Sequence, residues 1–235
     1  MWAFLSNSWL SLLLTAIIAY LLGSINWAII VTRLFSNKDI RTVGSGNAGA
    51  TNVLRSQGVL PAVLTAVGDL GKGILAVMVG SYLMANLNLS GEVPAELRTF
   101  APDAAHLIGG YLGGLCCVIG HMFPVFYGFR GGKGVMATLG MFFVLDWRIA
   151  VLGLLLFLVT VAISRMVSLG SVLAASYVPV LTLVFRLWVD KMPTAAVIFC
   201  TVLSGLIAAI VIWKHGANMR RIAEGTERRL GETKP

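Results

Sequence analysis

The chain has 235 residues, of which 57% are hydrophobic and only 12% are charged, and its mean hydropathy is +0.86. Soluble domains carry about 25% charged residues, so the composition excludes a water-facing globular surface, a disordered chain and a coiled coil. It also excludes a nucleic-acid-binding domain, even though the net charge is +8. One membrane-spanning helix needs roughly 20 apolar residues, so a chain of this length has room for at most about seven spans and no separate soluble domain.

The apolar runs are continuous rather than alternating, which predicts helices and disfavours a β-barrel. In chain order, the predicted spans cover about residues 9–35, 60–87, 105–127, 134–146, 148–164, 167–188 and 193–213. The first run is not a secretory signal, because it is too long and no basic residue precedes Arg33. Pro61 suits the first turn of the second span. Residues 88–104, which hold two prolines and several charges, are expected to form a loop.

Residues 135–163 can form one long span or two short spans separated at Asp146, Trp147 and Arg148. Within one span, Asp146 and Arg148 would lie near the bilayer centre at a cost of about 2.5–3.5 kcal/mol each. Residues two apart also do not face each other on a helix. Two short spans place the tripeptide at the membrane surface, where Trp147 is favourable.

The distribution of basic residues supports seven spans. With seven, thirteen of the 18 Lys and Arg residues lie on one side of the membrane, four lie on the other, and Lys72 lies within the second span. Because basic residues concentrate on the cytoplasmic side, the N-terminus is predicted outside and the C-terminus in the cytoplasm. The sequence therefore predicts an all-α integral membrane protein with seven transmembrane helices. Its polar segments 36–57, 120–134 and 214–229 would meet on the cytoplasmic face.

The first polar segment contains Gly44-Ser45-Gly46-Asn47-Ala48-Gly49-Ala50-Thr51-Asn52-Val53-Leu54-Arg55. Its glycines let backbone amides approach a ligand closely. Thr51 and Asn52 are predicted to cap a short helix whose N-terminus favours an anion, and Arg55 adds a fixed charge on that helix. The run also fits G-x-G-x-x-G, but a membrane helix precedes it where a dinucleotide-binding fold requires a strand. The alternative is a flexible loop between helices.

The second segment contains Gly120-His121-Met122-Phe123-Pro124-Val125-Phe126-Tyr127-Gly128-Phe129-Arg130-Gly131-Gly132-Lys133-Gly134-Val135-Met136-Ala137-Thr138. Glycines surround Lys133 at the entry to a helix, which suits a phosphate. The run is not a Walker A loop, because Tyr127 stands where Gly is needed and Gly134 replaces the residue that holds magnesium. The alternatives are an interfacial role for His121 and a purely topological role for Lys133.

The third segment is His215-Gly216-Ala217-Asn218-Met219-Arg220-Arg221-Ile222-Ala223-Glu224-Gly225-Thr226-Glu227. His215, Asn218 and Met219 would share one helical face. The alternative is a solvated basic tail against anionic lipid.

Three further groups of residues lie within the predicted spans. Asp69 and Lys72 form an i, i+3 pair that is either a structural ion pair or part of a functional site. Ser168 and Ser171 are polar contacts between helices or donors in a site. The three cysteines, which lie in apolar runs, are interpreted as packing residues rather than metal ligands or nucleophiles: Cys116, Cys117 and Cys200.

The three segments resemble the signature segments of the bacterial acyl-phosphate-dependent glycerol-3-phosphate acyltransferases. The resemblance is carried by G-S-G-N-A-G-A-T-N-V-L-R from Gly44, by G-H-M-F-P-V-F-Y-G-F-R-G-G-K-G-V-M-A-T from Gly120, and by H-x-x-N-M-R-R-x-x-x-G-T-E from His215. It extends over nearly the whole chain and includes its size and helix order. Some members of the family carry Lys at the position of Arg130, which keeps the charge but changes its geometry.

The resemblance implies that an acyl group passes from acyl phosphate to the 1-hydroxyl of glycerol 3-phosphate in phospholipid synthesis. It implies an enzyme of the bacterial inner membrane that works without metal or organic cofactor and does not use acyl-CoA or acyl carrier protein directly. The expected partners are the two phosphorylated substrates, the lipid bilayer and the enzyme that forms acyl phosphate. No nucleic acid is expected.

Candidate site residues follow from these segments. The candidate catalytic residues are Ser45, Lys133, His215 and Glu227. The candidate substrate-binding residues are Gly44, Gly46, Asn47, Gly49, Thr51, Asn52, Arg55, His121, Arg130, Gly131, Gly132, Gly134, Thr138, Ser168 and Asn218. Three candidates for the general base stay open: His215 with Glu227, His121, and the phosphate of the substrate itself.

Two other functions are compatible with parts of the sequence. A transporter of a phosphorylated solute would also need basic residues among helices, but no convincing internal repeat is found. An intramembrane serine protease would place its serine within the membrane, whereas Ser45 lies in a charged loop.

Overall fold

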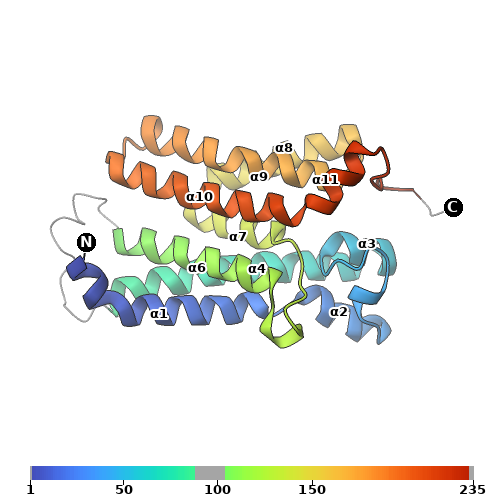
Figure 1. Ribbon diagram of the computed structural model, residues 1–235, viewed down its shortest axis with the longest axis horizontal. Coiled ribbons are helices and arrows are strands. Elements are labelled where there is room, and N and C mark those ends of the chain that lie inside the picture. Colours follow the sequence, from blue (N-terminus) through green and yellow to red (C-terminus); the bar gives the residue numbers. More distant parts are fainter. Residues whose placement is uncertain (1, 88–103, 233–235) are drawn as a thin grey trace.

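The computed structural model describes residues 2–87 and 104–232, so the predicted loop at 88–104 lies outside the described residues except for its last position. Every regular element in the described part of the chain is helical. The helices run side by side along the long axis of the molecule (Figure 1). In chain order they are α1 (Trp2–Ser24), α2 (Trp27–Ser36), η1 (Ile40–Thr42), α3 (Ala50–Gln57), α4 (Val59–Asn86), α6 (Ala104–Met122), η2 (Val125–Tyr127), α7 (Val135–Leu145), α8 (Trp147–Ser164), α9 (Val167–Val184), η3 (Phe185–Val189), α10 (Thr194–Lys214) and α11 (Gly216–Ala223).

Each of the seven predicted runs contains helix, although the first helix begins at Trp2, seven residues before the predicted start. Among the described residues, six segments are long and apolar enough to cross a membrane: Ser8–Ser36, Val59–Asn86, Ala104–Tyr127, Trp147–Ser164, Val167–Val189 and Thr194–Lys214. The remaining run, α7, has 11 residues and is therefore only about 16 Å long. That α7 makes a seventh crossing stays a prediction.

The first predicted span is not one helix, because the chain breaks at Ile25 and Asn26 between α1 and α2. Asn26 caps α2 by accepting a hydrogen bond from the amide of Ile29. Carbonyl groups left free at the end of α1 are satisfied from another helix, since Lys72 Nζ donates to the carbonyl oxygens of Gly23 and Ile25 at 3.0 and 2.8 Å. The intramembrane lysine thus stabilises the break.

Two groups of helices form the bundle. The first comprises α1, α4, α6 and α7, and the second comprises α8, α9 and α10. Small residues allow close contact in the first group, where a β-carbon on Gly80 would lie 2.2 Å from the carbonyl oxygen of Gly109. Helices in membranes pack closely through such residues. The two groups are linked through α7 and α8, which follow each other directly in the chain.

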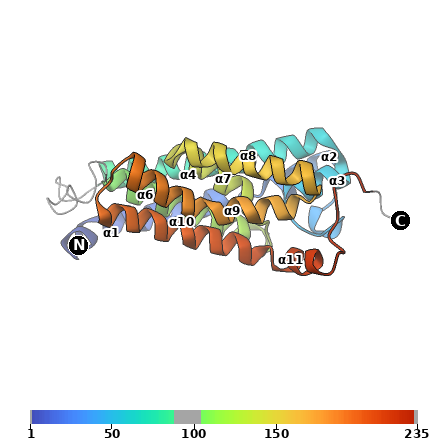
Figure 2. The same ribbon diagram turned by 90° about the horizontal axis from the view of Figure 1, so that it is seen from above.

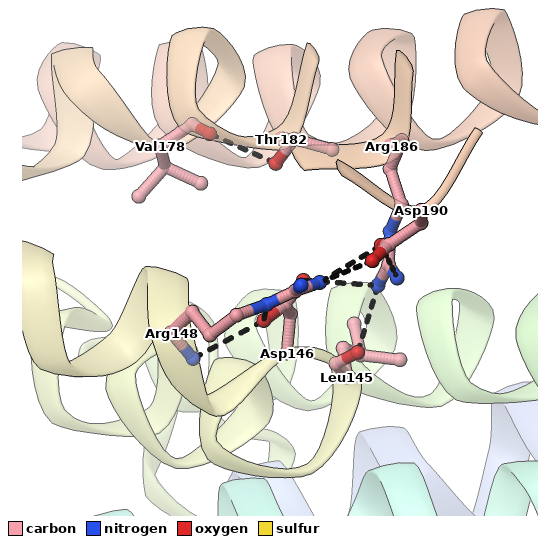
Figure 3. Close-up of polar contacts among 7 residues, drawn as sticks. All are labelled: Leu145, Asp146, Arg148, Val178, Thr182, Arg186 and Asp190. Carbon is pink, nitrogen blue, oxygen red and sulfur yellow. Dashed lines mark hydrogen bonds and ion pairs between the residues drawn. The ribbon is translucent and has the colours of Figure 1, made fainter. Parts of the chain in front are cut away.

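The junction between α7 and α8 carries a cluster of ion pairs (Figure 3). Asp146 has extended backbone angles and caps α8, so its carboxylate pairs with the guanidinium of Arg148 at 2.7 Å. Asp190 accepts hydrogen bonds from Arg148 and Arg186, and Arg186 also donates to the carbonyl oxygen of Leu145. Because Asp146 lies outside the helix, the restriction on residues two apart within one helix does not apply to this pair. The cluster joins this junction to the end of α9.

Several polar segments gather at the opposite end of the bundle. In both views, α2, α3 and α11 lie at the end that holds the C-terminus, away from the N-terminal end of α1 (Figures 1 and 2). The loop between η2 and α7 folds back on the end of α6, since the amides of Gly131 and Gly132 bond to the carbonyl oxygens of Met122 and His121. This arrangement brings the three sequence segments together.

Candidate active site

The three segments enclose one large cavity, which we call the phosphate cavity. Its volume is about 630 Å³. The residues that line it include all four candidate catalytic residues and most candidate substrate-binding residues: Ser45, Lys133, His215, Glu227, Gly44, Gly46, Asn47, Gly49, Thr51, Asn52, Arg55, His121, Gly131, Gly134, Ser168 and Asn218. Segments that are up to about 180 residues apart in sequence therefore meet at one place.

Asn52 organises the first wall of the cavity. It is buried, its side-chain oxygen accepts from the amide of Ser45 at 2.8 Å, and its side-chain nitrogen donates to the carbonyl oxygens of Ile40, Val43 and Asn47. These bonds occupy the side chain within the protein. They fix the loop that carries Ser45, so the position of that serine depends on Asn52.

The helix α3 starts two residues or more before the predicted position. Gly49 is its N-cap, and Thr51 and Asn52 lie in its first turn, so the expectation that these two side chains cap the helix is wrong. Arg55 lies one turn further along and donates to the carbonyl oxygen of Arg228 at 3.2 Å. Burial lowers the pKa of Arg55, and the nearby Arg228 lowers it further. The negative charge of Glu227 opposes these shifts, so both basic and acidic groups lie near the guanidinium.

The glycine-rich loop offers fewer free amides than expected. The amides of Gly131 and Gly132 are hydrogen-bonded to the end of α6, so they are not available to a phosphate. Gly134, whose φ is +82°, is the N-cap of α7, and its left-handed conformation explains the glycine at this position. The open helix end after Gly134 and the side chain of Lys133 remain as anion-binding groups in the cavity.

Lys133 is a partly buried cation that lines the phosphate cavity. Its ammonium donates a 2.5 Å hydrogen bond to the side-chain oxygen of Asn218. Burial lowers the pKa of Lys133 to about 8, although the negative charge of Glu227 opposes this shift. A neutral partner thus orients Lys133 without cancelling its charge.

Glu227 is the centre of a polar network in the third segment. One carboxylate oxygen accepts from Ser168 Oγ and from the side-chain nitrogen of Asn218, each at 2.7 Å, and the other accepts from Arg221 at 2.8 Å. Burial opposes ionisation of Glu227, but these three hydrogen bonds lower its pKa. Both oxygens of Glu227 are thus engaged, and the network connects Asn218 and Arg221 of α11 to Ser168 of α9.

His215 lies at the end of α10, where only 2% of its surface is exposed. Its Nδ1 is 2.8 Å from the carbonyl oxygen of Val211, a partner that requires the proton on Nδ1. The free Nε2 is then an acceptor. Burial lowers the pKa of His215 to about 4, and the positive charge of Lys133 contributes to the shift. Met219 keeps the helical i, i+4 spacing from His215, but its side chain is exposed.

The pair formed by Asp69 and Lys72 reaches the phosphate cavity through His121. Lys72 Nζ lies 2.8 Å from Asp69 Oδ1 and 2.8 Å from His121 Nδ1, and all three side chains are buried. Asp69 and His121 line the cavity. The pair is therefore both a structural link between helices and a neighbour of the candidate site.

A second, apolar cavity of about 90 Å³ adjoins the first one. It lies among α7, α8, α9 and α10 and is lined mainly by side chains such as Phe142, Ile149 and Leu154. The two cavities share four lining residues: Val135, Met136, Phe157 and Ser171. The polar cavity and the apolar cavity therefore adjoin at these four residues.

Three candidate residues do not line the phosphate cavity. Gly132 packs against His121 at its edge, Thr138 lines the apolar cavity, and Arg130 is exposed. Asp69 and Ser171, for which a site role was one of two alternatives, also line the cavity, whereas the sequence interpretation missed Lys214, Arg221 and Arg228. Arg221 lies within the third segment, so its membership of that segment could have indicated a place in the cavity. Arg228 directly follows the segment, and only its positive charge could have indicated such a place.

The described part of the chain holds no metal-binding cluster and no paired cysteine. Residues 2–87 and 104–232 contain no group of three or more His, Cys, Asp or Glu side chains that can hold a metal ion. The cysteines are free, with Cys117 and Cys200 buried and Cys116 partly buried, as expected of packing residues.

A family model and individual relatives both match the chain over most of its length. A family model described as glycerol-3-phosphate acyltransferase matches residues 13–225. Proteins named glycerol-3-phosphate acyltransferase from Jannaschia sp. (strain CCS1) and Clostridioides difficile (strain 630) are 40% and 37% identical to the chain. These alignments cover 97% and 95% of the chain and 98% of each relative. None of these names favours a transporter.

Two solved structures have a similar fold. They are crystal structures of PlsY (YgiH), described as an integral membrane glycerol 3-phosphate acyltransferase, in its glycerol 3-phosphate form and its lysophosphatidic acid form. Their TM-scores are 0.74 and 0.72, and their sequence identities are 32% and 31%. Each comparison covers 94% of the chain and 96% of the solved structure.

Proposed function

The chain belongs to the glycerol-3-phosphate acyltransferase family, and on this premise we propose that it transfers a fatty acyl group from acyl phosphate to the 1-hydroxyl of sn-glycerol 3-phosphate. The products are lysophosphatidic acid and inorganic phosphate. The observation that carries the proposal is the junction of the basic phosphate cavity with the apolar cavity. Acyl phosphate has this same division into an anionic head and an apolar chain.

The phosphate cavity offers two sets of groups for two phosphates. One set comprises Ser45, Asn47, Thr51 and Arg55 from the first segment, and the other comprises Lys133 with the open end of α7. Helix ends and basic side chains favour phosphate. The acyl chain is assigned to the apolar cavity, where the Thr138 hydroxyl has no hydrogen-bond partner among the described residues.

The reaction needs no nucleophilic residue, because the acyl donor already carries a good leaving group. The 1-hydroxyl oxygen of glycerol 3-phosphate attacks the acyl carbonyl carbon, a new ester bond forms, and the bond to the phosphate oxygen breaks. The proton of the hydroxyl leaves to a base. The protein contributes alignment of the two substrates and stabilisation of negative charge by Lys133 and Arg55.

Among the candidate bases, the geometry favours the phosphate of the substrate. Glu227 has both oxygens hydrogen-bonded and a lowered pKa. His215 has a free Nε2, but its pKa of about 4 makes it a weak proton acceptor. A phosphate monoester has a second pKa of about 6, and is therefore the stronger base within the same cavity.

The protein is a multi-pass integral membrane protein. We place α7 as a seventh crossing, the N-terminus outside, and the phosphate cavity at the cytoplasmic face of the bacterial inner membrane. The excess of basic residues at the cavity end supports this orientation. A C-terminal tag in intact spheroplasts should resist protease until the membrane is permeabilised, and cleavage in intact spheroplasts would reverse the orientation.

The activity is tested with the purified full chain in detergent, supplied with palmitoyl phosphate and labelled glycerol 3-phosphate. We expect labelled lysophosphatidic acid and inorganic phosphate in equal amounts. Phosphate release without the labelled product would indicate hydrolysis and contradict the proposal. In parallel, uptake of labelled glycerol 3-phosphate into proteoliposomes would identify a transporter.

A further inference from the structure

The buried cluster of Asp69, Lys72 and His121 has no role in the proposed reaction so far, although it reaches the wall of the phosphate cavity. Asp69, Lys72 and His121 are 2%, 4% and 3% exposed. Burying ionisable groups at this depth is unfavourable unless they are paired, and such groups in membrane helices usually serve function. The hydrogen bonds of the cluster indicate what that function is.

The ammonium of Lys72 determines the protonation of His121. An ammonium has three hydrogens and no lone pair. Its three hydrogen-bond partners are the carbonyl oxygens of Gly23 and Ile25, at 3.0 and 2.8 Å, and His121 Nδ1 at 2.8 Å. His121 Nδ1 must therefore accept, and it can carry no proton. Asp69 Oδ1, 2.8 Å from Lys72 Nζ, balances the charge of the ammonium. It also lies 3.4 Å from His121 Nδ1, a longer contact than the 2.8 Å between that nitrogen and Lys72.

With Nδ1 acting as an acceptor, the neutral ring of His121 carries its proton on Nε2. The hydrogen bonds found among residues 2–87 and 104–232 include none that is donated by this Nε2. The ring lines the phosphate cavity, and Nε2 lies against the backbone of the glycine-rich loop, where a β-carbon on Gly132 would come within 2.2 Å of it. Within the described ranges, the Nε2–H of this buried residue thus has no partner, and it lies at the wall of an anion-binding cavity.

We propose that Asp69 and Lys72 are positioning residues that hold His121 as a neutral hydrogen-bond donor, whose Nε2–H binds a phosphoryl oxygen of a substrate in the phosphate cavity. The substrate assignment rests on the proposed function, but the state of the ring does not. The opposite arrangement holds at His215, where the carbonyl oxygen of Val211 requires the proton on Nδ1. The two histidines of the cavity therefore have different chemistry: His121 donates, and His215 accepts. This excludes His121 as the general base.

The state of the ring is tested by nitrogen-15 NMR of the full chain in detergent, labelled only at histidine and measured without substrate. The chain has three histidines, so the variant His121→Asn identifies the signal. We expect His121 protonated at Nε2 only, and His215 protonated at Nδ1 only, at neutral pH. A His121 ring protonated at Nδ1, or at both nitrogens, would overturn the proposal. Because no substrate is present, this result is independent of whether the chain is an acyltransferase.

The role of His121 as a hydrogen-bond donor is tested by two variants, His121→Gln and His121→Asn, whose side-chain amide nitrogens lie at different distances from the backbone. The amide nitrogen of Gln can approach the position of Nε2, whereas that of Asn ends near Nδ1. We expect His121→Asn to raise the KM for one phosphorylated substrate by about 10- to 100-fold, as for the loss of a hydrogen bond to a charged group. His121→Gln should recover most of the loss. Equal kinetics in the two variants, whether impaired or normal, would overturn the donor role.

Separate KM values of the His121 variants for palmitoyl phosphate and for glycerol 3-phosphate identify which of the two substrates has its phosphoryl oxygen bound by His121.

The role of the ion pair is tested by the double variant Asp69→Asn/Lys72→Met, which removes both charges together. In this variant we expect His121 to populate both neutral forms and the same KM to rise. Retention of the single Nε2–H form would overturn the positioning role. If the double variant does not fold, the wild-type spectrum and the pair of His121 variants still decide the proposal.

Discussion

Lys133 donates a hydrogen bond to the side-chain oxygen of Asn218 and so connects the loop before α7 to the helix α11. Asn218 donates in turn to Glu227, which also accepts from Ser168 at the start of α9. The ammonium is thus held by a chain of polar contacts whose only carboxylate is already paired with Arg221. Its charge remains available to a phosphate, which is the condition for charge stabilisation in the proposed reaction.

Removal of the basic side chain of Lys133 or of Arg55 should abolish acyl transfer without unfolding the protein. We expect Lys133→Ala and Arg55→Ala to lower kcat/KM by at least about 100-fold, as when a group that stabilises developing charge is removed. Lys38→Ala is the matched control, because Lys38 is exposed and does not line the phosphate cavity. Wild-type kinetics in either purified cavity variant would contradict the shared anion site.

The pH dependence should report the charge of Lys133. Burial lowers its pKa to about 8, so the free enzyme loses this positive charge as the pH rises through that value. We therefore expect kcat/KM to fall above a pH of about 8. In Lys133→Arg the guanidinium stays charged, and the fall should move to higher pH. The same alkaline limb in both proteins would assign it to another group.

The contact between Gly132 and His121 should be required for activity. A β-carbon at Gly132 would lie 2.2 Å from His121 Nε2 and 2.4 Å from the carbonyl oxygen of Ala48, so Gly132→Ala must displace the loop that carries Lys133. We expect loss of most activity with a normal elution profile. Gly71→Ala is the control, since a β-carbon there has no neighbour within 4 Å. If both alanine variants transfer equally well, the tight packing at Gly132 is not needed.

The ion-pair cluster at the far end of the bundle should contribute to stability and not to catalysis. Asp146 caps α8 and pairs with Arg148, so Asp146→Ala loses both interactions, and loss of a cap alone costs about 0.5–2 kcal/mol. Asp146→Asn retains a capping oxygen and should lose less. Thermal unfolding in detergent should follow the order wild type, Asn, Ala, with kcat unchanged. A lower kcat in the folded Asn variant would argue against a purely structural cluster.

Much of the architecture could be predicted because apolar runs and charges constrain a membrane protein strongly. The break at Asp146 was predictable from the cost of burying two charges. The break at Asn26 was not, because its stabilising partner, Lys72, comes from a helix 46 residues later. The residues of the cavity could be predicted as a group from three polar segments that share one face.

The roles within the cavity could not be predicted to the same degree. Asn52 was expected at a helix cap and instead fixes the loop of Ser45, since Gly49 takes the cap. The amides of Gly131 and Gly132 were expected to face a ligand and instead bond to the end of α6. In both cases the partner is a backbone carbonyl or amide, and the sequence does not distinguish one backbone group from another.

The central claim is that acyl phosphate is the direct acyl donor, and the measurement that tests it most directly is donor competition with the purified full chain. Labelled glycerol 3-phosphate is supplied with palmitoyl phosphate or with palmitoyl-CoA, each with and without a metal chelator. We predict lysophosphatidic acid from palmitoyl phosphate at a rate that the chelator does not change, and none from palmitoyl-CoA. Equal transfer from palmitoyl-CoA, or loss of transfer on chelation, would contradict the account.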